Sequence, residues 1–326
     1  MIDWPRFVEI VQSHQRFLVT SHVRPDCDAM GSELAMADIL EGLGKEVLVV
    51  NDFAVPPNYR FVDPGKRLKQ LGVDVSADEL NAYEVLVILD TSAWAQLGAM
   101  GDVIRAFPGR KLVIDHHVGN DDLGAEFFKD TKAEATGRLV IEAADQLGVE
   151  ITARIAQNVF IAVATDTGWF RFPSTTGQTL RLAGRLVDLG VPFDTLYQQL
   201  YENDTLARLK LIGRTMGRTK TELDGRLIHT YIERADFDAL AAHPADSEDM
   251  INMTLSVGGT EVAVILVEQK TGGFKISFRS RCEFDCSRIA RLFGGGGHKK
   301  AAGGFIDEPL QTAQAKVLDA VRKAMT

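Results

Sequence analysis

Residues 16–32 read RFLVTSHVRPDCDAMGS, an apolar run followed at once by a histidine and two aspartates. RFLV is typical of a short strand, and apolar residues recur with helical spacing over residues 29–43. His22, Asp26 and Asp28 therefore fall in a tight strand-to-helix turn. Such a turn is either an ordinary polar turn with an aspartate capping the helix, or one wall of a metal site.

The first half of the chain alternates strand and helix patterns. Short runs rich in Val, Ile and Leu recur in KEVLVVN (45–51), YEVLVILD (83–90) and RKLVIDHH (110–117), and helical spacing recurs at 134–148 and 152–165. This alternation predicts an α/β fold, with a parallel sheet covered by helices on both faces. We assign this N-terminal domain to residues 1–190.

The second half changes character. Helical patterns at 177–190, 193–203 and 205–217 predict a helical connector over 191–215. From about residue 219 the apolar residues alternate in twos, with Asp224-Gly225 as a hairpin turn in KTELDGRLIHTYI. We therefore expect a smaller α+β domain over 216–326, which ends in LFGGGGHKKAAGG and a helix at about 310–325.

Charge and cysteine content limit the classes of function. The 326 residues carry a formal net charge of −9, which argues against a protein that grips long duplex nucleic acid but leaves short oligonucleotides open. The three cysteines form no C-x-x-C pair, so a reducing compartment is expected. No apolar run has the length of a signal peptide or a membrane span, and we expect a cytoplasmic protein without a membrane partner.

Acidic and imidazole side chains follow several of the predicted elements. Asp90 closes VLVILD, KLVIDHH ends in Asp115, His116 and His117, and Asp166 follows a helix pattern in ATDTGWF. In an open α/β sheet, ligands bind outside the carboxyl ends of the strands. We therefore expect these side chains to meet those of the 22–28 turn at one sheet edge.

The expected cluster is rich in oxygen with some nitrogen. Such a ligand set suits Mn²⁺ or Mg²⁺ better than structural Zn²⁺. Two divalent cations would balance the formal charge of −4 that is carried by Asp26, Asp28, Asp90 and Asp166. Two ions about 3.5 to 4 Å apart would clamp a phosphate and ionise a water for in-line attack on phosphorus. The predicted reaction is hydrolysis of a phosphoester or phosphoanhydride.

The same motifs carry a resemblance to a known family. SHVRPDCDAMGS, the aspartate of VILDTS, DHH at 115–117 and the aspartate of ATDTGWF resemble the four motifs of the DHH phosphoesterases. FRSR (278–281) followed by FGGGGHKKAAGG (293–304) resembles the DHH-associated C-terminal domain. The match runs in order over nearly the whole chain. Within this family, the chain is most similar to the nano-RNase branch. The members of that branch are oligoribonucleases that also remove the 3′-phosphate of 3′-phosphoadenosine 5′-phosphate.

The resemblance implies a role for each motif residue. One metal ion would be held by His22, Asp26 and Asp90, and the other by Asp28, Asp90, His116 and Asp166, with Asp90 as the bridge. Asp115 would orient an imidazole and His117 would face the substrate phosphate, so the implied catalytic set is Asp90, Asp115 and His117. Cys27 stands where the family usually has glycine. We expect the turn to tolerate the thiol, which would make activity sensitive to oxidation.

Substrate binding is expected in the C-terminal domain. Consecutive glycines leave backbone N–H groups free to approach an anion, and Arg279 offers a planar fork for phosphate. With His117, the predicted substrate-binding residues are Arg279, Ser280, Gly296, Gly297 and His298. The alternative is that the glycine run is only a flexible loop. We interpret the charged stretches 121–134 and 218–226 as solvated faces.

The sequence thus predicts a phosphoesterase with two Mn²⁺ or Mg²⁺ ions that trims short single-stranded RNA or DNA oligonucleotides to mononucleotides. Conversion of 3′-phosphoadenosine 5′-phosphate to AMP is expected as well, and a homodimer is compatible with the sequence. The alternative within the same chemistry is hydrolysis of linear or cyclic dinucleotides such as the di-adenylates. An alternative of another class is a nucleotide-sensing module without turnover, against which the complete set of apparent ligands argues.

Overall fold

The chain divides into two compact units, Met1–Asn203 and Asp204–Thr326. The computed structural model describes residues 2–119 and 121–325. The division falls inside the connector expected at 191–215. Its helix α8 (Phe193–Tyr201) belongs to the first unit, and α9 (Leu206–Gly217) belongs to the second.

A six-stranded sheet forms the centre of the first unit, in the order β3-β2-β1-β4-β5-β6, and every neighbouring pair is parallel, as predicted. Its strands are β1 (Arg16–Thr20), β2 (Glu46–Asn51), β3 (Leu68–Gln70), β4 (Val85–Leu89), β5 (Arg110–Asp115) and β6 (Glu126–Lys129). The helices are α1 (Trp4–Ser13), α2 (Cys27–Gly42), α3 (Ala77–Leu80), α4 (Met100–Ala106), α5 (Thr136–Leu147), α6 (Ala153–Asp166), α7 (Gly177–Asp188) and α8, with short 3₁₀ helices at Pro57–Tyr59 and Trp94–Gln96.

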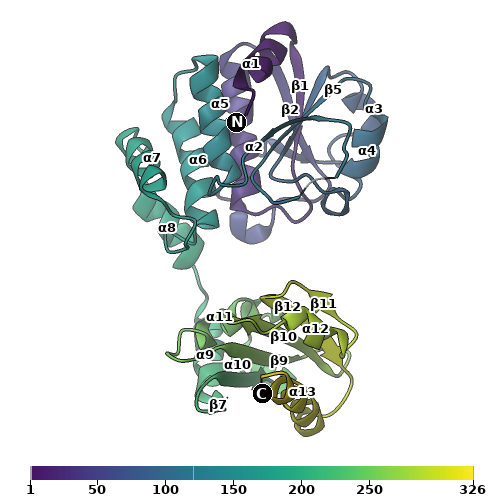
Figure 1. Ribbon diagram of the computed structural model, residues 1–326, viewed down its shortest axis with the longest axis vertical. Helices are drawn as coiled ribbons and strands as arrows, with labels where there is room; N and C mark the ends of the chain where they lie inside the picture. Colours follow the sequence, from purple (N-terminus) through teal and green to yellow (C-terminus); the bar gives the residue numbers. More distant parts are fainter. Residues whose placement is uncertain (1, 120, 326) are drawn as a thin grey trace. The chain divides into compact units, whose positions relative to one another are not determined.

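Both faces of this sheet are covered, because successive side chains of a strand point to opposite faces. Val19 and Val87 pack with α1, α2, α5 and α6 in one core. Leu18 and Ile88 pack with α3 and α4 in another. Figure 1 shows these two groups of helices on opposite sides of the strands. The uninterrupted apolar runs of the sequence are therefore strands that are buried on both faces.

The strand order reverses next to β1. The chain passes from β1 to β2 and β3 on one side and then returns to β4 on the other. The crevice outside the carboxyl ends of the strands at such a reversal is the usual ligand site of open α/β sheets. Close packing of α2 against α6 fixes one wall, since a Cβ on Gly31 would lie 2.4 Å from the Asn158 carbonyl oxygen.

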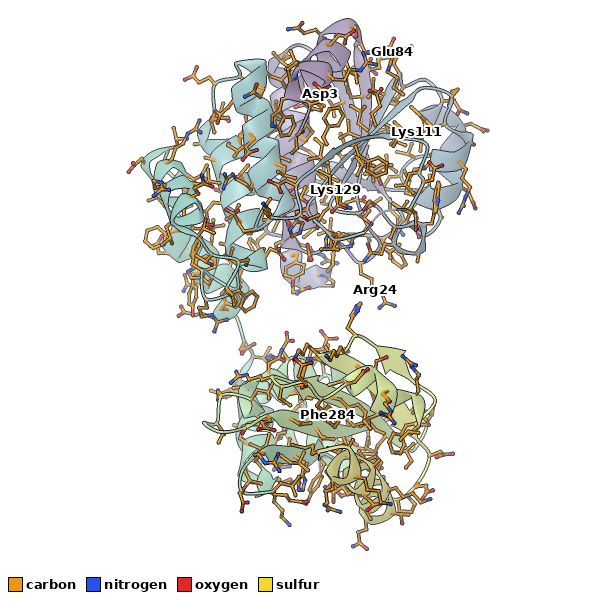
Figure 2. All side chains as sticks on the ribbon, in the orientation of Figure 1. Asp3, Arg24, Glu84, Lys111, Lys129 and Phe284 are labelled. Atoms are coloured by element: carbon orange, nitrogen blue, oxygen red, sulfur yellow. The ribbon has the colours of Figure 1, made fainter. Side chains whose placement is uncertain are left out.

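The second unit has a mixed six-stranded sheet in the order β11-β12-β10-β9-β8-β7, in which only the β8–β9 pair of the described strands is parallel. Phe284, labelled in Figure 2, belongs to the core that α12 and α13 form on one face. The helices α9, α10 and α11 cover the other face. The elements after α9 are β7 (Lys220–Glu222), β8 (Leu227–Ile232), α10 (Arg234–Leu240), a 3₁₀ helix at Pro244–Ser247, α11 (Met250–Thr254), β9 (Val262–Glu268), β10 (Phe274–Ser280), α12 (Cys286–Arg291), β11 (Gly296–Gly297), β12 (Ala301–Ile306) and α13 (Leu310–Met325).

None of the helices in the described part of the chain combines the length and the apolar character that a membrane span requires.

Candidate metal centre

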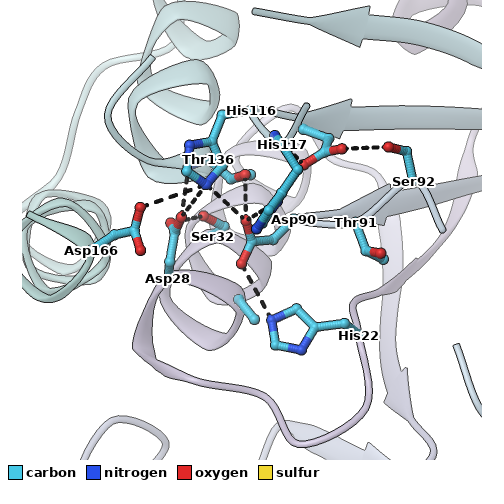
Figure 3. Close-up of polar contacts among 12 residues, drawn as sticks. His22, Asp28, Ser32, Asp90, Thr91, Ser92, His116, His117, Thr136 and Asp166 are labelled. Carbon is cyan, nitrogen blue, oxygen red and sulfur yellow. Dashed lines mark hydrogen bonds and ion pairs between the residues drawn. The ribbon is translucent and has the colours of Figure 1, made fainter. Parts of the chain in front are cut away.

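The segments that carry the predicted ligands meet at the sheet reversal. Figure 3 shows side chains from the turn after β1, from the ends of β4 and β5 and from the end of α6 pointing toward one another. Three overlapping groups each bring their potential ligand atoms within 4.8 Å of one another: His22, Asp26 and Asp90; Asp28, His116 and Asp166; and Asp90, His116 and His117. The structure therefore brings together all six residues that were predicted as metal ligands.

Asp90 lies at the centre of this cluster. Its φ of +61° is in the left-handed region, which aspartate tolerates better than most residues. Its Oδ2 lies 3.4 Å from His22 Nε2, and its Oδ1 lies 3.5 Å from His116 Nε2. Thr136 Oγ1 donates a hydrogen bond of 2.8 Å to Oδ1. The two oxygens of one carboxylate thus face two different histidines, which is the arrangement that a bridging ligand requires.

The two histidines are oriented by backbone carbonyls. His22 Nδ1 lies 2.9 Å from the Val23 oxygen, and His116 Nδ1 lies 3.1 Å from the Ala133 oxygen. When Nδ1 donates to a carbonyl, the neutral ring presents the lone pair of Nε2. That atom of His116 lies 3.5 to 3.7 Å from carboxylate oxygens of Asp28, Asp90 and Asp166. Lone pairs that face carboxylates in this way fit a shared cation.

Asp26 and Asp28 both have structural partners. Asp26 is the N-cap of α2 and accepts hydrogen bonds from the backbone N–H groups of Asp28 and Ala29, at 3.0 and 3.1 Å. The buried Asp28 carboxylate accepts from the N–H groups of Thr136 (2.7 Å) and Gly137 (2.9 Å) at the start of α5. The capping interpretation of the turn is therefore correct, and the same carboxylates also belong to the candidate ligand groups.

The electrostatics of the cluster favour bound positive charge. Burial and the neighbouring Asp28 carboxylate raise the pKa of Asp90 well above its usual range, and burial raises the pKa of Asp28. Burial and Asp28 also raise the pKa of Asp166 to about 6. Burial opposes protonation of His22, but the hydrogen bonds to Asp90 and to the Val23 carbonyl, together with the charges of Asp90 and Asp26, outweigh it and raise the pKa of His22 to about 9. Carboxylates that are buried together repel each other unless cations separate them.

Asp115 and His117 form a pair beside the cluster. The fully buried Asp115 accepts a hydrogen bond from the His117 N–H at 3.0 Å, and its Oδ1 lies 2.9 Å from His117 Nδ1. Burial disfavours the charge of Asp115, yet its hydrogen bonds to His117 and Lys129 lower its pKa. The His117 side chain is 49% exposed. Asp115 therefore fixes the imidazole from behind, and the ring keeps a solvent-facing side.

Two contributors to the site were not predicted from the sequence. Thr136 supplies a hydroxyl to Asp90 and a backbone N–H to Asp28. Lys129 forms an ion pair of 2.8 Å with Asp115, although it lies in the stretch 121–134 that we interpreted as a solvated face. That interpretation was wrong for Lys129, since its side chain is only 14% exposed. The start of a predicted helix at 134 was the one signal that pointed toward Thr136.

Cys27 belongs to the apolar core and not to the cluster. Its side chain is 2% exposed and packs in the apolar core of the first unit. Burial raises the pKa of its thiol, which keeps the sulfur protonated. No cysteine belongs to the candidate ligand groups within residues 2–119 and 121–325. The turn tolerates the thiol, as expected, but the burial of the sulfur argues against the predicted sensitivity to oxidation.

The predicted substrate-binding residues of the second unit also lie close together. In β10, Arg279 pairs with Ala301 of β12, and Gly297 of β11 pairs with the adjacent Ala302. The exposed His298 lies in the turn between β11 and β12, and its N–H donates to the Ala301 carbonyl at 2.8 Å. The glycine run is thus an ordered strand and turn, and it is not merely a flexible loop.

Gly295, next to the predicted set, and Ser280, within it, have specific structural roles. A Cβ on Gly295 would lie 1.9 Å from the Gly303 carbonyl oxygen, so glycine is needed for β11 to approach β12. Ser280 is buried, and its hydroxyl bonds to the backbone of Cys282 within the turn. The Ser280 N–H donates to the Lys300 carbonyl at 2.9 Å.

Comparison with known proteins confirms the predicted family. Residues 16–163 match the model of the DHH family, N-terminal domain, and residues 224–326 match that of the DHHA1 domain. The chain is 34% identical to the bifunctional oligoribonuclease and PAP phosphatase NrnA of Thermus thermophilus, over 94% of this chain and 90% of that protein. It is 27% identical to the protein of the same name from Bacillus subtilis, over 92% of each.

Solved structures show the same fold. An exopolyphosphatase-related protein from Bacteroides fragilis superposes with a TM-score of 0.87 at 27% identity, covering 98% of this chain and 95% of that one. Exonuclease RecJ bound to manganese superposes with a TM-score of 0.58 at 14% identity, covering 99% and 95%. At that identity, the likeness to RecJ shows a shared fold.

Proposed function

This chain belongs to the DHH family, and on that basis we propose that it is a metal-dependent phosphoesterase that hydrolyses short oligoribonucleotides to mononucleotides. We include conversion of 3′-phosphoadenosine 5′-phosphate to AMP, because the relatives from Thermus thermophilus and Bacillus subtilis are named for both activities. The observation that carries the proposal is the convergence of carboxylates and imidazoles from four chain segments around Asp90.

Two divalent ions fit this donor set. In the proposal, one ion would be held by His22, Asp26 and Asp90, and the other by Asp28, Asp90, His116 and Asp166. The oxygen-rich set with imidazole nitrogen favours Mn²⁺, with Mg²⁺ as the substitute. When bound, the ions supply the charge that holds the phosphate and lowers the pKa of the attacking water.

The remaining residues position these groups and the substrate. Thr136 and the start of α5 hold the carboxylates of Asp90 and Asp28 in place through three hydrogen bonds. Asp115 holds the His117 ring by Nδ1, so that Nε2 is available to donate to a phosphate oxygen. Such a donor stabilises the negative charge that develops on the phosphoryl group.

The second unit is proposed to bind the rest of the substrate. Arg279 offers a planar guanidinium, and the exposed turn that contains Gly296, Gly297 and His298 offers N–H groups and an imidazole. Contacts of this kind bind backbone phosphates without reading the base sequence. We therefore expect short single-stranded RNA or DNA of mixed sequence to be accepted.

Release of mononucleotides from a 5′-labelled ribotrimer in the presence of Mn²⁺ tests the proposal. The panel also contains a pentanucleotide, 3′-phosphoadenosine 5′-phosphate, and linear and cyclic di-adenylates. We expect turnover of the trimer and of the bisphosphate, and loss of both with Asp90→Ala or with a chelator. Turnover of the cyclic dinucleotide alone would support the alternative substrate class. Binding without turnover of any member would support the nucleotide-sensing module, and full turnover by Asp90→Ala would reject the metal assignment.

A further inference from the structure

Lys129 lies at the end of the edge strand β6, next to Asp115 in the parallel β5–β6 register. We propose that Lys129 is a positioning residue that holds His117 in place through Asp115. The inference rests on the proposed function, because it concerns the part that His117 plays in phosphoester hydrolysis. Neither the family motifs nor the sequence pattern points to this lysine.

The contacts of Lys129 account for all three N–H groups of its ammonium. Nζ lies 2.8 Å from Asp115 Oδ2, and it donates to the Ser92 hydroxyl and to the Gly119 carbonyl. The single hydroxyl proton of Ser92 is then free to reach Asp115 Oδ2, at 2.7 Å. Figure 3 marks the hydrogen bond from Ser92 to Asp115 with a dashed line, and Figure 2 labels Lys129 in the first unit.

Asp115 is saturated from both sides by this arrangement. Its Oδ2 receives Lys129 and Ser92, while its Oδ1 receives the backbone N–H and Nδ1 of His117. The carboxylate is fully buried, so a charge without a paired cation would be strongly unfavourable there. Lys129, whose side chain is 14% exposed, supplies that cation.

The same lysine also ties down the chain that follows the DHH motif. The Gly119 carbonyl accepts from Lys129 and lies 3.0 Å from Ser92 Oγ. In the sequence, His117 lies between Asp115 and Gly119, and Lys129 contacts both of these residues. Lys129 therefore fixes both ends of the short segment that presents the imidazole.

Removing the ammonium leaves the buried Asp115 carboxylate without its cation and takes one donor from the Gly119 carbonyl. Segment 117–119 must then shift to let water reach the carboxylate, and the His117 ring shifts with it, whereas the neighbouring His116 stays held at Nδ1 by the Ala133 carbonyl. The metal ligands are held by other partners, namely the backbone carbonyls of Val23 and Ala133 and the start of α5. We therefore expect turnover to fall while metal binding stays intact.

The test compares Lys129→Met with Lys132→Met, the same change at an exposed lysine three residues away. We expect Lys129→Met to lower kcat on the ribotrimer about 10-fold, in the lower part of the range for residues that orient a catalytic group. KM and the midpoint of Mn²⁺ binding should stay close to the wild-type values, because the metal ligands keep their own partners. Lys129→Arg should restore most of kcat, and Lys132→Met should behave as wild type.

A double-mutant cycle separates positioning from a general structural role. In a His117→Ala background, Lys129→Met should have almost no further effect on kcat. An equal loss of kcat in both backgrounds would overturn the inference. If Lys129→Met fails to fold, Ser92→Ala decides instead, because it removes another partner of the same Asp115 oxygen. It should lower kcat in the wild-type background and have no effect in the His117→Ala background.

Hydrogen exchange gives a readout that needs no turnover. The His117 amide donates to Asp115, so we expect Lys129→Met, but not Lys132→Met, to speed exchange in segment 116–119 of the Mg²⁺-loaded protein. If the wild type does not cleave the trimer but exchange responds as expected, the proposed function is wrong and the positioning of His117 stands. If the wild type cleaves and Lys129→Met changes neither kcat nor exchange, only the Lys129 inference is wrong.

Discussion

Asp90→Asn should stabilise the metal-free protein and at the same time remove most of its stabilisation by Mn²⁺. The substitution keeps the shape of the side chain, and the amide can still accept from Thr136 Oγ1 and donate to His22 Nε2. It removes one of two carboxylates that are each only 2% exposed and whose charges repel. A carboxyl whose folded-state pKa is raised lowers the stability of the folded state at every pH above that pKa. The stabilisation of the metal-free protein by Asp90→Asn should therefore be largest in alkaline solution.

The expected sizes follow from these contacts. Because the pKa of Asp90 is raised in spite of its contact with His22, its charge is unfavourable on balance, and neutralising it should increase the free energy of unfolding of the metal-free protein by about 1 to 3 kcal/mol. For a unit of about 200 residues, that corresponds to roughly 3 to 10 °C in the melting temperature. At a Mn²⁺ concentration 100 times its dissociation constant, the metal stabilises the wild type by about 2.7 kcal/mol. A variant that binds 100-fold more weakly would gain only about 0.4 kcal/mol.

Thermal melts at pH 8, with chelator and with a series of Mn²⁺ concentrations, measure both effects. Asp102→Asn is the matched control, because the Asp102 side chain is 89% exposed and pairs with the neighbouring Arg105 on the surface of α4. The control should leave both the metal-free melting temperature and the Mn²⁺ shift unchanged. Equal Mn²⁺ shifts in wild type and Asp90→Asn would show that Asp90 is not a metal ligand. A lower melting temperature of the metal-free variant would refute the repulsion argument.

Three further outcomes are expected. Thr136→Val should lower kcat about 10- to 100-fold by releasing the Asp90 carboxylate, whereas Thr136→Ser should retain activity, and steady-state kinetics with Mn²⁺ titration compares them. Arg279→Ala should raise KM for the trimer at least severalfold without loss of bound metal, so that metal loss measured by elemental analysis would contradict the two-site description. Because burial raises the pKa of Asp166 to about 6, the metal-free protein should lose stability as the pH rises from about 4 to 6. Thermal melts across this pH range measure the loss, which should be smaller in Asp166→Asn. The same pH dependence of the melting temperature in Asp166→Asn would assign the loss to other groups.

The elements around the site could be predicted because their signals are local. The apolar runs before His22, Asp90 and Asp115 are strands β1, β4 and β5, and the spacing at 152–165 is helix α6. These elements are long enough for periodicity to show which residues are buried. The short edge strands β3 and β6 carry weaker patterns and were not predicted, since three or four residues give no measurable period.

The partners that orient the site could not be predicted from the sequence. Thr136 contacts Asp28 across 108 residues and Asp90 across 46 residues. Lys129 and Asp115 are neighbours only because β6 pairs with β5. In the sequence, Lys129 is one charge in a polar stretch, and no spacing distinguishes it from the exposed Lys132.

The sequence by itself determined the alternation of strands and helices, the family, and the residues that converge at the sheet edge. It could do so because strand ends in a parallel sheet share one edge, and because the motifs mark those ends. Only the tertiary structure decided that Asp26 both caps α2 and faces His22, that Cys27 is buried in the core, and that Lys129 pairs with Asp115. These outcomes depend on distances between segments that are remote in the chain, and such distances are set by packing rather than by local pattern.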